Sequence, residues 1–125
     1  MQKISIGPVA LTTTLTTNIF NPGTTTGGVN CTAAPFNKLF AELYFLRVVN
    51  KTIYPVTVSL WLGASGANAA GTEFLWQGYS VAPNGFVEWY SAVGERMSVD
   101  RFLVGGASAS TSLSIHGEAL IGIGY

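Results

Sequence analysis

The sequence predicts an all-β fold: a single-domain antiparallel β-sandwich or jelly roll of about 7–8 strands with a long N-terminal arm or loop. Three observations predict it. Apolar and polar residues alternate with period two over several short segments, Val and Thr are frequent in them, and Gly, Pro and Asn separate them. A length of 125 residues fits one domain, so residues 1–125 are expected to form a single unit.

The N-terminal third combines one expected strand with one long loop. Val9, Leu11, Leu15 and Ile19 recur among threonines, which predicts a long strand because branched side chains pack well on a pleated surface. Residues 21–38 follow and are rich in Gly, Thr and Pro, so we expect a loop within the domain. Loops longer than about 15 residues are unusual in compact domains and are often functional or ordered by a partner.

The rest of the chain is predicted to form short strands separated by turn residues. The expected strands span 40–49, 56–62, 72–77, 86–91, 101–105 and 113–123. Asn50-Lys51-Thr52 and Pro83-Asn84-Gly85 supply turn chemistry, and residues 63–71 form a loop of small residues. One alternative stays open over 33–46, where apolar residues also fall at the spacing of a short helix.

The strand over 56–62 assigns its side chains to two faces. Val56, Val58, Leu60 and Leu62 share one phase and are expected in the core. Trp61 has the opposite phase and is therefore expected to point outward. Exposed Trp and Tyr side chains mark contacts with proteins or sugars, so Trp61 is a candidate interface residue.

The charge content of the chain is low. Six Lys or Arg balance six Asp or Glu, and charged residues make up 10% of the chain, against about 25% in ordinary soluble domains. Binding to nucleic acid requires clustered Lys and Arg, so no nucleic acid partner is expected. A weakly charged neutral surface tends to associate, which favours contacts with other protein subunits.

Signals for export and membrane insertion are not expected in this chain. The N-terminal segment has no continuous apolar stretch of the secretory kind, and no run reaches 18 apolar residues. We therefore expect a protein made in the cytoplasm, not secreted and without a membrane partner. The single Cys31 cannot form an internal disulfide, and the glycosylation sequons at Asn30 and Asn50 are expected to be incidental.

Residues that could carry catalysis are few and show no catalytic spacing. His116 is the one histidine and shares no zinc-binding motif with Cys31. The serines near His116 are not in a nucleophile elbow, and Asp100 is expected in a turn. Glu88 and Glu95 form a formal carboxylate pair, but we expect the first to face outward from a strand and the second to lie in a polar loop. No enzymatic activity, metal or cofactor is expected.

The remaining aromatic and charged residues indicate a contact surface. Aromatic side chains with no place in a simple core, together with the most charged stretch of the chain, are suited to registering a neighbouring subunit. The candidate protein-interface residues are Trp61, Tyr44, Trp89, Tyr90, Glu95, Arg96, Asp100 and Arg101.

Parts of the sequence resemble the small β-sandwich virion proteins of tailed bacteriophages. The similarity lies in LRVVNKT at 46–52 with PVTVSLWL at 55–62, in SVAPNG at 80–85 and in GGASASTSLSI at 105–115. It covers residues 40–121 and leaves out the Thr-rich N-terminal third. The resemblance implies an antiparallel sandwich with a structural role in the particle and no enzymatic activity.

The resemblance favours a capsid decoration or cement protein that stabilises the head through contacts between subunits. It implies major capsid or other virion proteins as partners, a homo-oligomer such as a trimer, and synthesis in the host cytoplasm before assembly into the virion. Two alternatives stay open: a neck- or tail-associated structural protein, and a carbohydrate-binding adhesin module. The adhesin alternative predicts exposed aromatic side chains along one shallow groove, with Trp61, Trp76 and Trp89 as candidates.

Overall fold

The computed structural model describes residues 2–14, 17–20, 39–62, 73–97 and 102–123, and every regular element within them is a β-strand. The prediction of an all-β fold is therefore confirmed. The strands are β1 (Gln2–Ala10), β2 (Thr17–Phe20), β3 (Leu39–Asn50), β4 (Val56–Leu62), β5 (Tyr79–Val81), β6 (Phe86–Met97), β7 (Leu103–Ala107) and β8 (Leu113–Ile123).

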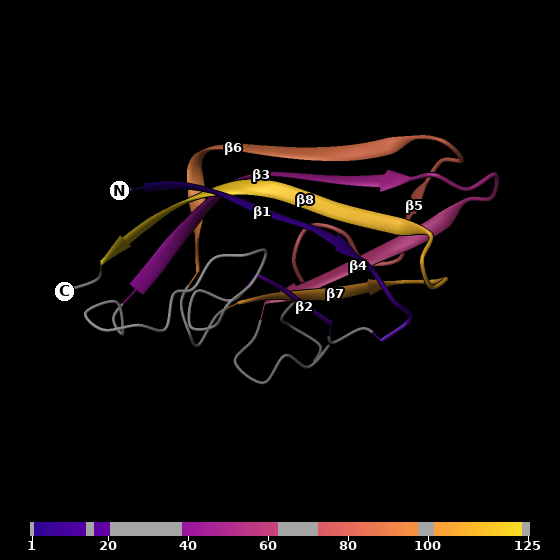
Figure 1. The fold of residues 1–125 in the computed structure, drawn as a ribbon, viewed down its shortest axis with the longest axis horizontal. Coiled ribbons are helices and arrows are strands. Elements are labelled where there is room, and N and C mark those ends of the chain that lie inside the picture. Colours follow the sequence, from indigo (N-terminus) through magenta and orange to yellow (C-terminus); the bar gives the residue numbers. More distant parts are fainter. Residues whose placement is uncertain (1, 15–16, 21–38, 63–72, 98–101, 124–125) are drawn as a thin grey trace.

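The eight strands form two antiparallel sheets that pack face to face (Figure 1). Sheet A has the order β1-β8-β3-β6, and sheet B has the order β2-β7-β4-β5. The pairing is nested, because β1 pairs with β8, β2 with β7, β3 with β6 and β4 with β5. This is the jelly-roll arrangement, in which consecutive strands pass from one sheet to the other except at β4 and β5, which are neighbours in sheet B.

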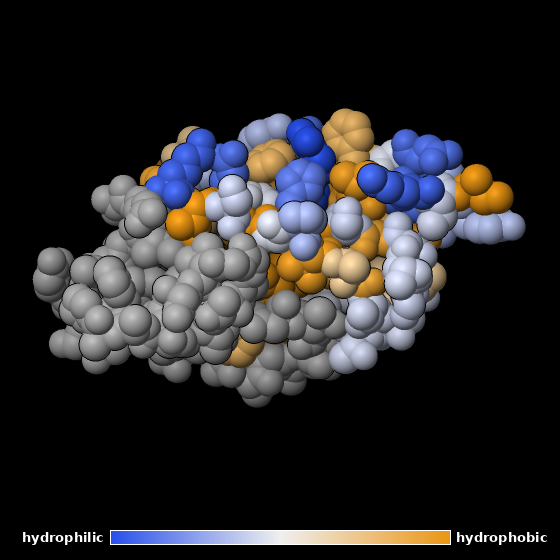
Figure 2. Space-filling view, viewed as in Figure 1, coloured by the Kyte–Doolittle hydropathy of each residue, from blue (hydrophilic) through white to orange (hydrophobic). Residues whose placement is uncertain are grey.

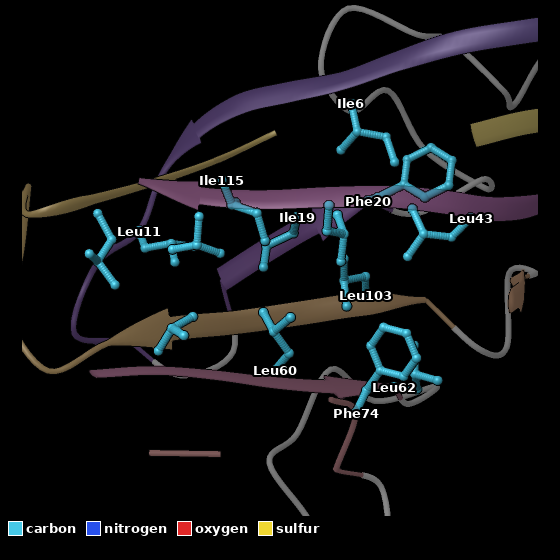
Figure 3. Packing of buried hydrophobic residues seen from close by; sticks show 14 of the residues in the cluster. Ile6, Leu11, Ile19, Phe20, Leu43, Leu60, Leu62, Phe74, Leu103 and Ile115 are labelled. Carbon is cyan, nitrogen blue, oxygen red and sulfur yellow. The ribbon is translucent and has the colours of Figure 1, made fainter. Parts of the chain in front are cut away.

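The core lies between the two sheets and is built from alternate residues of each strand. Figure 3 shows these side chains meeting between the ribbons of the two layers. In β4 the predicted inward phase is confirmed, since Val56, Val58, Leu60 and Leu62 are all buried. The largest fully buried side chains are Phe20, Ile6, Leu11, Ile19, Leu43, Leu46, Leu60, Met97, Leu103, Leu113, Ile115 and Val48.

Strand β3 carries an extra residue in the middle of sheet A. Its register shifts between Leu43 and Phe45 against both β6 and β8, which makes Tyr44 a bulge. Leu43 and Leu46 are buried, whereas Tyr44 and Phe45 are both half-buried on the opposite side. The bulge therefore places two consecutive aromatic residues on the outer face of sheet A.

The two outer strands of sheet A are also irregular. Strand β1 shifts register between Ile6 and Val9, where Gly7-Pro8 lies opposite His116. In the register of β6 with β3, Tyr90 pairs with Phe45 and Glu95 pairs with Leu43. Residues 91–94 of β6 therefore lie opposite the single residue Tyr44 and form a larger bulge, which we call the β6 excursion. Pro, bulges and charged residues on edge strands discourage pairing with another sheet, so both edges of sheet A are protected.

Several sequence-based boundaries were wrong. The single strand expected over 9–19 is divided between β1 and β2, because the chain crosses from sheet A to sheet B there. The strand expected over 40–49 is confirmed as β3, so in the described residues 39–46 the short helix left open as an alternative does not form. Residues 73–76 are not a regular strand, although they run beside β4 with a bridge between Glu73 and Trp61. The expected loop at 21–38 lies outside the described residues.

The expectation that Trp61 is exposed was wrong. The alternation correctly gives Trp61 the phase opposite to the core, and it is not part of the main core cluster. It lies in the middle of sheet B, however, with Val104 on one side and Glu73 on the other. Trp61 is only 3% exposed and Val104 only 1%, so the outer face of sheet B is closed to solvent at this point.

Candidate functional site

The outer face of sheet A carries hollows that are lined by residues of all four of its strands. Three adjoining hollows of about 250, 390 and 670 Å³ share walls, and Glu118 of β8 lines all of them. Tyr44 separates the first two, and Phe45 separates the second from the third. We call this continuous surface the sheet A groove. Its principal side chains are Lys3, Ser5, Tyr44, Phe45, Arg47, Tyr90, Ser91, His116 and Glu118.

Aromatic side chains line much of the groove. The rings of Phe45 and Tyr90 are 4.9 Å apart between centroids, and His116 approaches Phe45 edge-on at 6.3 Å. The guanidinium carbon of Arg47 lies over Phe45 at 5.3 Å and over Phe86 at 5.5 Å from the ring centroids. These cation–π contacts keep the Arg47 guanidinium close to both rings at one end of the groove.

The charges of the groove are paired with one another. Arg47 forms an ion pair with Glu88, and its Nε donates a hydrogen bond of 2.6 Å to the Glu88 carboxylate. Lys3 pairs with Glu118 at 2.8 Å. The hydrogen bond between Arg47 and Glu88 raises the pKa of Arg47, so the guanidinium stays charged. The groove therefore presents many polar atoms with little net charge.

Tyr44 is held in place by a neighbour on its own strand. Its hydroxyl donates a hydrogen bond of 2.6 Å to the Glu42 carboxylate. This bond raises the pKa of Tyr44 above its ordinary value of 10.0, and desolvation and the negative charge of Glu42 act in the same direction. A β-carbon on Gly94 would come within 2.9 Å of the Tyr44 ring, so the tyrosine also packs closely against the β6 excursion.

A second set of exposed side chains is apolar and lies on the side of the sandwich that carries the outermost strands β5 and β6 of the two sheets. Among the described residues, the exposed large hydrophobic side chains are Ile53, Tyr54, Leu75, Tyr79, Phe86, Tyr90 and Val93. We call this set the apolar side. Its members belong to β5, to β6, to the segment before β5 or to the β3–β4 turn.

The β3–β4 turn is tied to the β5–β6 turn, which brings Ile53 and Tyr54 close to the residues that join β5 to β6. The backbone N–H of Asn84 donates to the Thr52 carbonyl oxygen at 3.0 Å, and the backbone N–H of Asn50 donates to the Gly85 carbonyl oxygen at 2.8 Å. In Figure 2 hydrophobic residues stand at the surface at the right-hand end, where these two turns project in Figure 1. Hydrophilic and hydrophobic residues are interspersed along the upper surface, which belongs to sheet A.

The structure divides the predicted interface residues among different environments. Tyr44 and Tyr90 lie together on the outer face of sheet A and line the same hollow. Trp89 has the opposite phase and packs edge-on against Phe74 at 5.7 Å, half-buried beside the core. Trp61 is buried, as described above. Asp100 and Arg101 lie outside the described residues.

The polar loop expected around Glu95 and Arg96 is the end of strand β6. Arg96 pairs in register with Glu42, and Glu95 pairs in register with Leu43. Neighbouring residues of a strand point to opposite faces, so these two charges do not form one surface patch. Sequence reasoning missed Phe45, Arg47 and Glu118 as site residues, because the β3 bulge that aligns them depends on pairing with two other strands.

Asn50 has a structural role and is not an exposed sequon residue. Its side chain is fully buried, and its Nδ2 donates to the carbonyl oxygens of Tyr54 at 2.8 Å and of Val81 at 3.0 Å. Its Oδ1 accepts hydrogen bonds from the amide of Thr52 at 2.9 Å and from the Thr52 hydroxyl at 2.8 Å. The amide that a glycan would modify is therefore already used to join the β3–β4 turn to β5.

The described residues contain no group of three or more His, Cys, Asp or Glu side chains arranged to hold a metal ion. In the same part of the chain, no helix is long and apolar enough to span a membrane. His116 lines one hollow together with Glu118, whose carboxylate pairs with Lys3.

Comparisons of the chain with protein-family models, with curated proteins and with solved structures gave no match.

Proposed function

We propose that this chain is a non-enzymatic structural protein of a bacteriophage virion, foremost a capsid decoration or cement protein. In this role it stabilises the head by packing its apolar side against neighbouring subunits. The partners are the major capsid protein or other virion proteins, together with further copies of the chain. A neck- or tail-associated position in the particle remains the alternative within the same class.

The apolar side is the observation that carries this proposal. Ile53 and Tyr54 are 72% and 68% exposed, and Tyr79 of β5 and Tyr90 of β6 are exposed as well. An exposed apolar surface with several tyrosines is typical of a protein–protein contact, because these side chains bury large areas with little loss of conformational freedom. The opposite side, formed by β1 and β2, has no comparable side chain among the described residues.

The low charge of the chain supports the same proposal. Of the nine charged residues in the described segments, Arg47 and Glu88 form one pair and Lys3 and Glu118 form another. A surface that is buried against neighbours is depleted in charge at its centre, whereas an isolated domain uses charge for solubility. The eight-stranded jelly roll also occurs in viral capsid proteins, which adds an argument by fold analogy alone.

The proposal is tested by assembly measurements on matched variants. Tyr79→Asp places a charge on the apolar side, and Thr13→Asp places the same charge at an exposed position near the end of β1. Light scattering after size-exclusion chromatography reports the oligomeric state, and sedimentation with particles that lack the protein reports binding. We expect Tyr79→Asp to weaken binding at least about ten-fold, and Thr13→Asp to leave it within about two-fold.

A wild-type chain that is a stable monomer and binds no particle component contradicts the proposal. Equal losses in the two Asp variants would contradict the role of the apolar side, because the effect would then follow the added charge and not its position. Leu75→Asn provides a variant compatible with the fold, since Leu75 has a φ of 60° and Asn tolerates this left-handed conformation better than Leu does. It should also weaken binding while leaving the unfolding temperature unchanged or higher.

A further inference from the structure

The sheet A groove lies apart from most of the apolar side and has a different character. Tyr90 is common to both, but the other side chains of the groove combine aromatic rings with carboxylate, guanidinium, imidazole and hydroxyl groups. Binding sites for small polar molecules have this composition: an apolar platform with a few polar groups that fix orientation. A surface of this kind needs an occupant that has both apolar faces and many hydroxyl groups.

We propose that the sheet A groove binds a neutral saccharide. The rings of Phe45 and Tyr90, 4.9 Å apart, offer an apolar surface for the C–H face of a sugar ring. Glu118, Arg47 and His116 surround this surface with hydrogen-bond donors and acceptors. Sugar hydroxyls act as both donor and acceptor, so they match a groove that presents both kinds of group.

The pairing of charges argues for a neutral ligand. Arg47 faces Glu88 and Lys3 faces Glu118, so neither cation is available to neutralise an acidic ligand without breaking an ion pair. The guanidinium has more N–H donors than its contacts with Glu88 use, and the Glu118 carboxylate has more lone pairs than one ammonium group engages. Both ion pairs can therefore accept further hydrogen bonds from uncharged hydroxyl groups.

The position of the groove argues against an extended peptide. It lies on the face of sheet A above β8 and β3, and each of these strands is paired with a neighbour on both sides. Their backbone N–H and C=O groups are directed along the sheet to those neighbours, so a peptide backbone would find no strand to extend. Recognition on this face depends on side chains alone, which suits a compact ligand.

The irregularities of sheet A shape the groove in advance of binding. The Tyr44 bulge turns Tyr44 and Phe45 to the same face, and the register shift at Gly7-Pro8 opens the largest hollow opposite His116. The two irregularities lie on the two neighbours of β8, on either side of the same short stretch of that strand. Bulges that redirect side chains toward one place are typical of binding sites.

The proposal is tested by titrating isotope-labelled protein with maltotriose, cellotriose and chitotriose and following amide NMR shifts, with sialyllactose as a charged comparison. A printed array of neutral glycans widens the search. We expect at least one neutral glycan to give saturable shifts in β3 and β8, with a dissociation constant on the order of 1 mM or below. Sialyllactose should bind more weakly than the best neutral sugar.

Three variants identify the groove as the site. Glu118→Gln replaces a charged hydrogen-bond acceptor with a neutral side chain of the same shape. Arg47→Lys keeps the positive charge opposite Glu88 but loses the planar guanidinium and its N–H donors. Tyr90→Ser removes one of the two aromatic rings of the apolar surface. Each should weaken binding at least about five-fold, while Tyr79→Ser, which removes an exposed tyrosine of β5, should leave it within about two-fold. Circular dichroism checks that each variant is folded.

Two results would overturn the proposal: no saturable binding to any neutral glycan, or binding that all three groove variants leave unchanged. Loss of self-association in Glu118→Gln would also overturn it, because it would show that a second copy occupies the groove. This inference does not rest on the proposed docking of the apolar side. Particle binding that survives Glu118→Gln but not Tyr79→Asp would separate the two surfaces.

Discussion

The buried side chain of Asn50 should contribute more to stability than any other polar side chain in the described residues. Its four hydrogen bonds to Thr52, Tyr54 and Val81 connect the β3–β4 turn to strand β5. Asn50→Ala removes all four and leaves the buried Val81 carbonyl and the Thr52 amide without these partners. The Tyr54 carbonyl loses less, because the Thr52 hydroxyl lies 2.9 Å from it and is free to donate its one proton there once the Asn50 side chain is gone.

The expected loss follows from the net worth of these bonds. At about 1 kcal/mol for each bond, with partial rescue of Tyr54 by Thr52 and solvent, Asn50→Ala should lower the free energy of unfolding by about 2–4 kcal/mol. For a chain of this length, that corresponds to a melting temperature lower by about 8–15 °C. Asn50→Asp should be at least as damaging at neutral pH, because a carboxylate would face two carbonyl oxygens and could donate to neither.

Urea denaturation followed by tryptophan fluorescence measures the effect. Gln77→Ala is the matched control, because Gln77 is an exposed amide side chain outside the strands and should change stability by less than about 0.5 kcal/mol. Asn50→Asp should regain stability as the pH falls, since protonation gives the carboxyl group one donor. An Asn50→Ala variant as stable as Gln77→Ala would refute the reasoning.

Three further predictions follow from named contacts. Because the hydrogen bond to Glu42 raises the pKa of Tyr44, this bond stabilises the fold below pH 10.0, and its contribution is lost as the pH rises further. Ultraviolet titration should show one tyrosine that ionises late; this signal should disappear in Tyr44→Phe and move toward the ordinary pKa in Glu42→Gln. Gly117→Ala should cost about 2–4 kcal/mol in urea denaturation, because a β-carbon there collides with the Phe45 carbonyl oxygen. Leu60→Ala should cost about 2.5–5 kcal/mol by the same assay, through the cavity it leaves in the core.

Local patterns were sufficient to predict the fold class and the best-formed strands. Alternation over 56–62 and 113–123 gave β4 and β8 because one face of each strand packs in the core. The turn at Pro83-Asn84-Gly85 was also predictable, and Asn84 has the left-handed φ of 52° that Asn tolerates. The nested order of the strands was not predictable, because it depends on pairing between residues far apart in the chain.

The candidate site was only partly predictable for the same reason. Tyr44 and Tyr90 were candidates because they are aromatic residues with no place in the core pattern. Alternation gives the face of a side chain but not what covers that face, which is why Trp61 was assigned to the surface and is buried. The bulge at Tyr44 exists only because β3 pairs with two strands at once, so no local pattern brings Phe45 beside Tyr90.

The central claim is that this weakly charged chain buries its apolar side against neighbouring subunits. Hydroxyl-radical footprinting tests it directly, by comparing the oxidation of Tyr54 and Tyr79 in the free protein and in protein bound to particles that lack it. The account predicts strong protection of both tyrosines on binding and no comparable protection of His116 in the sheet A groove. Equal oxidation of Tyr54 and Tyr79 in the two states would contradict it.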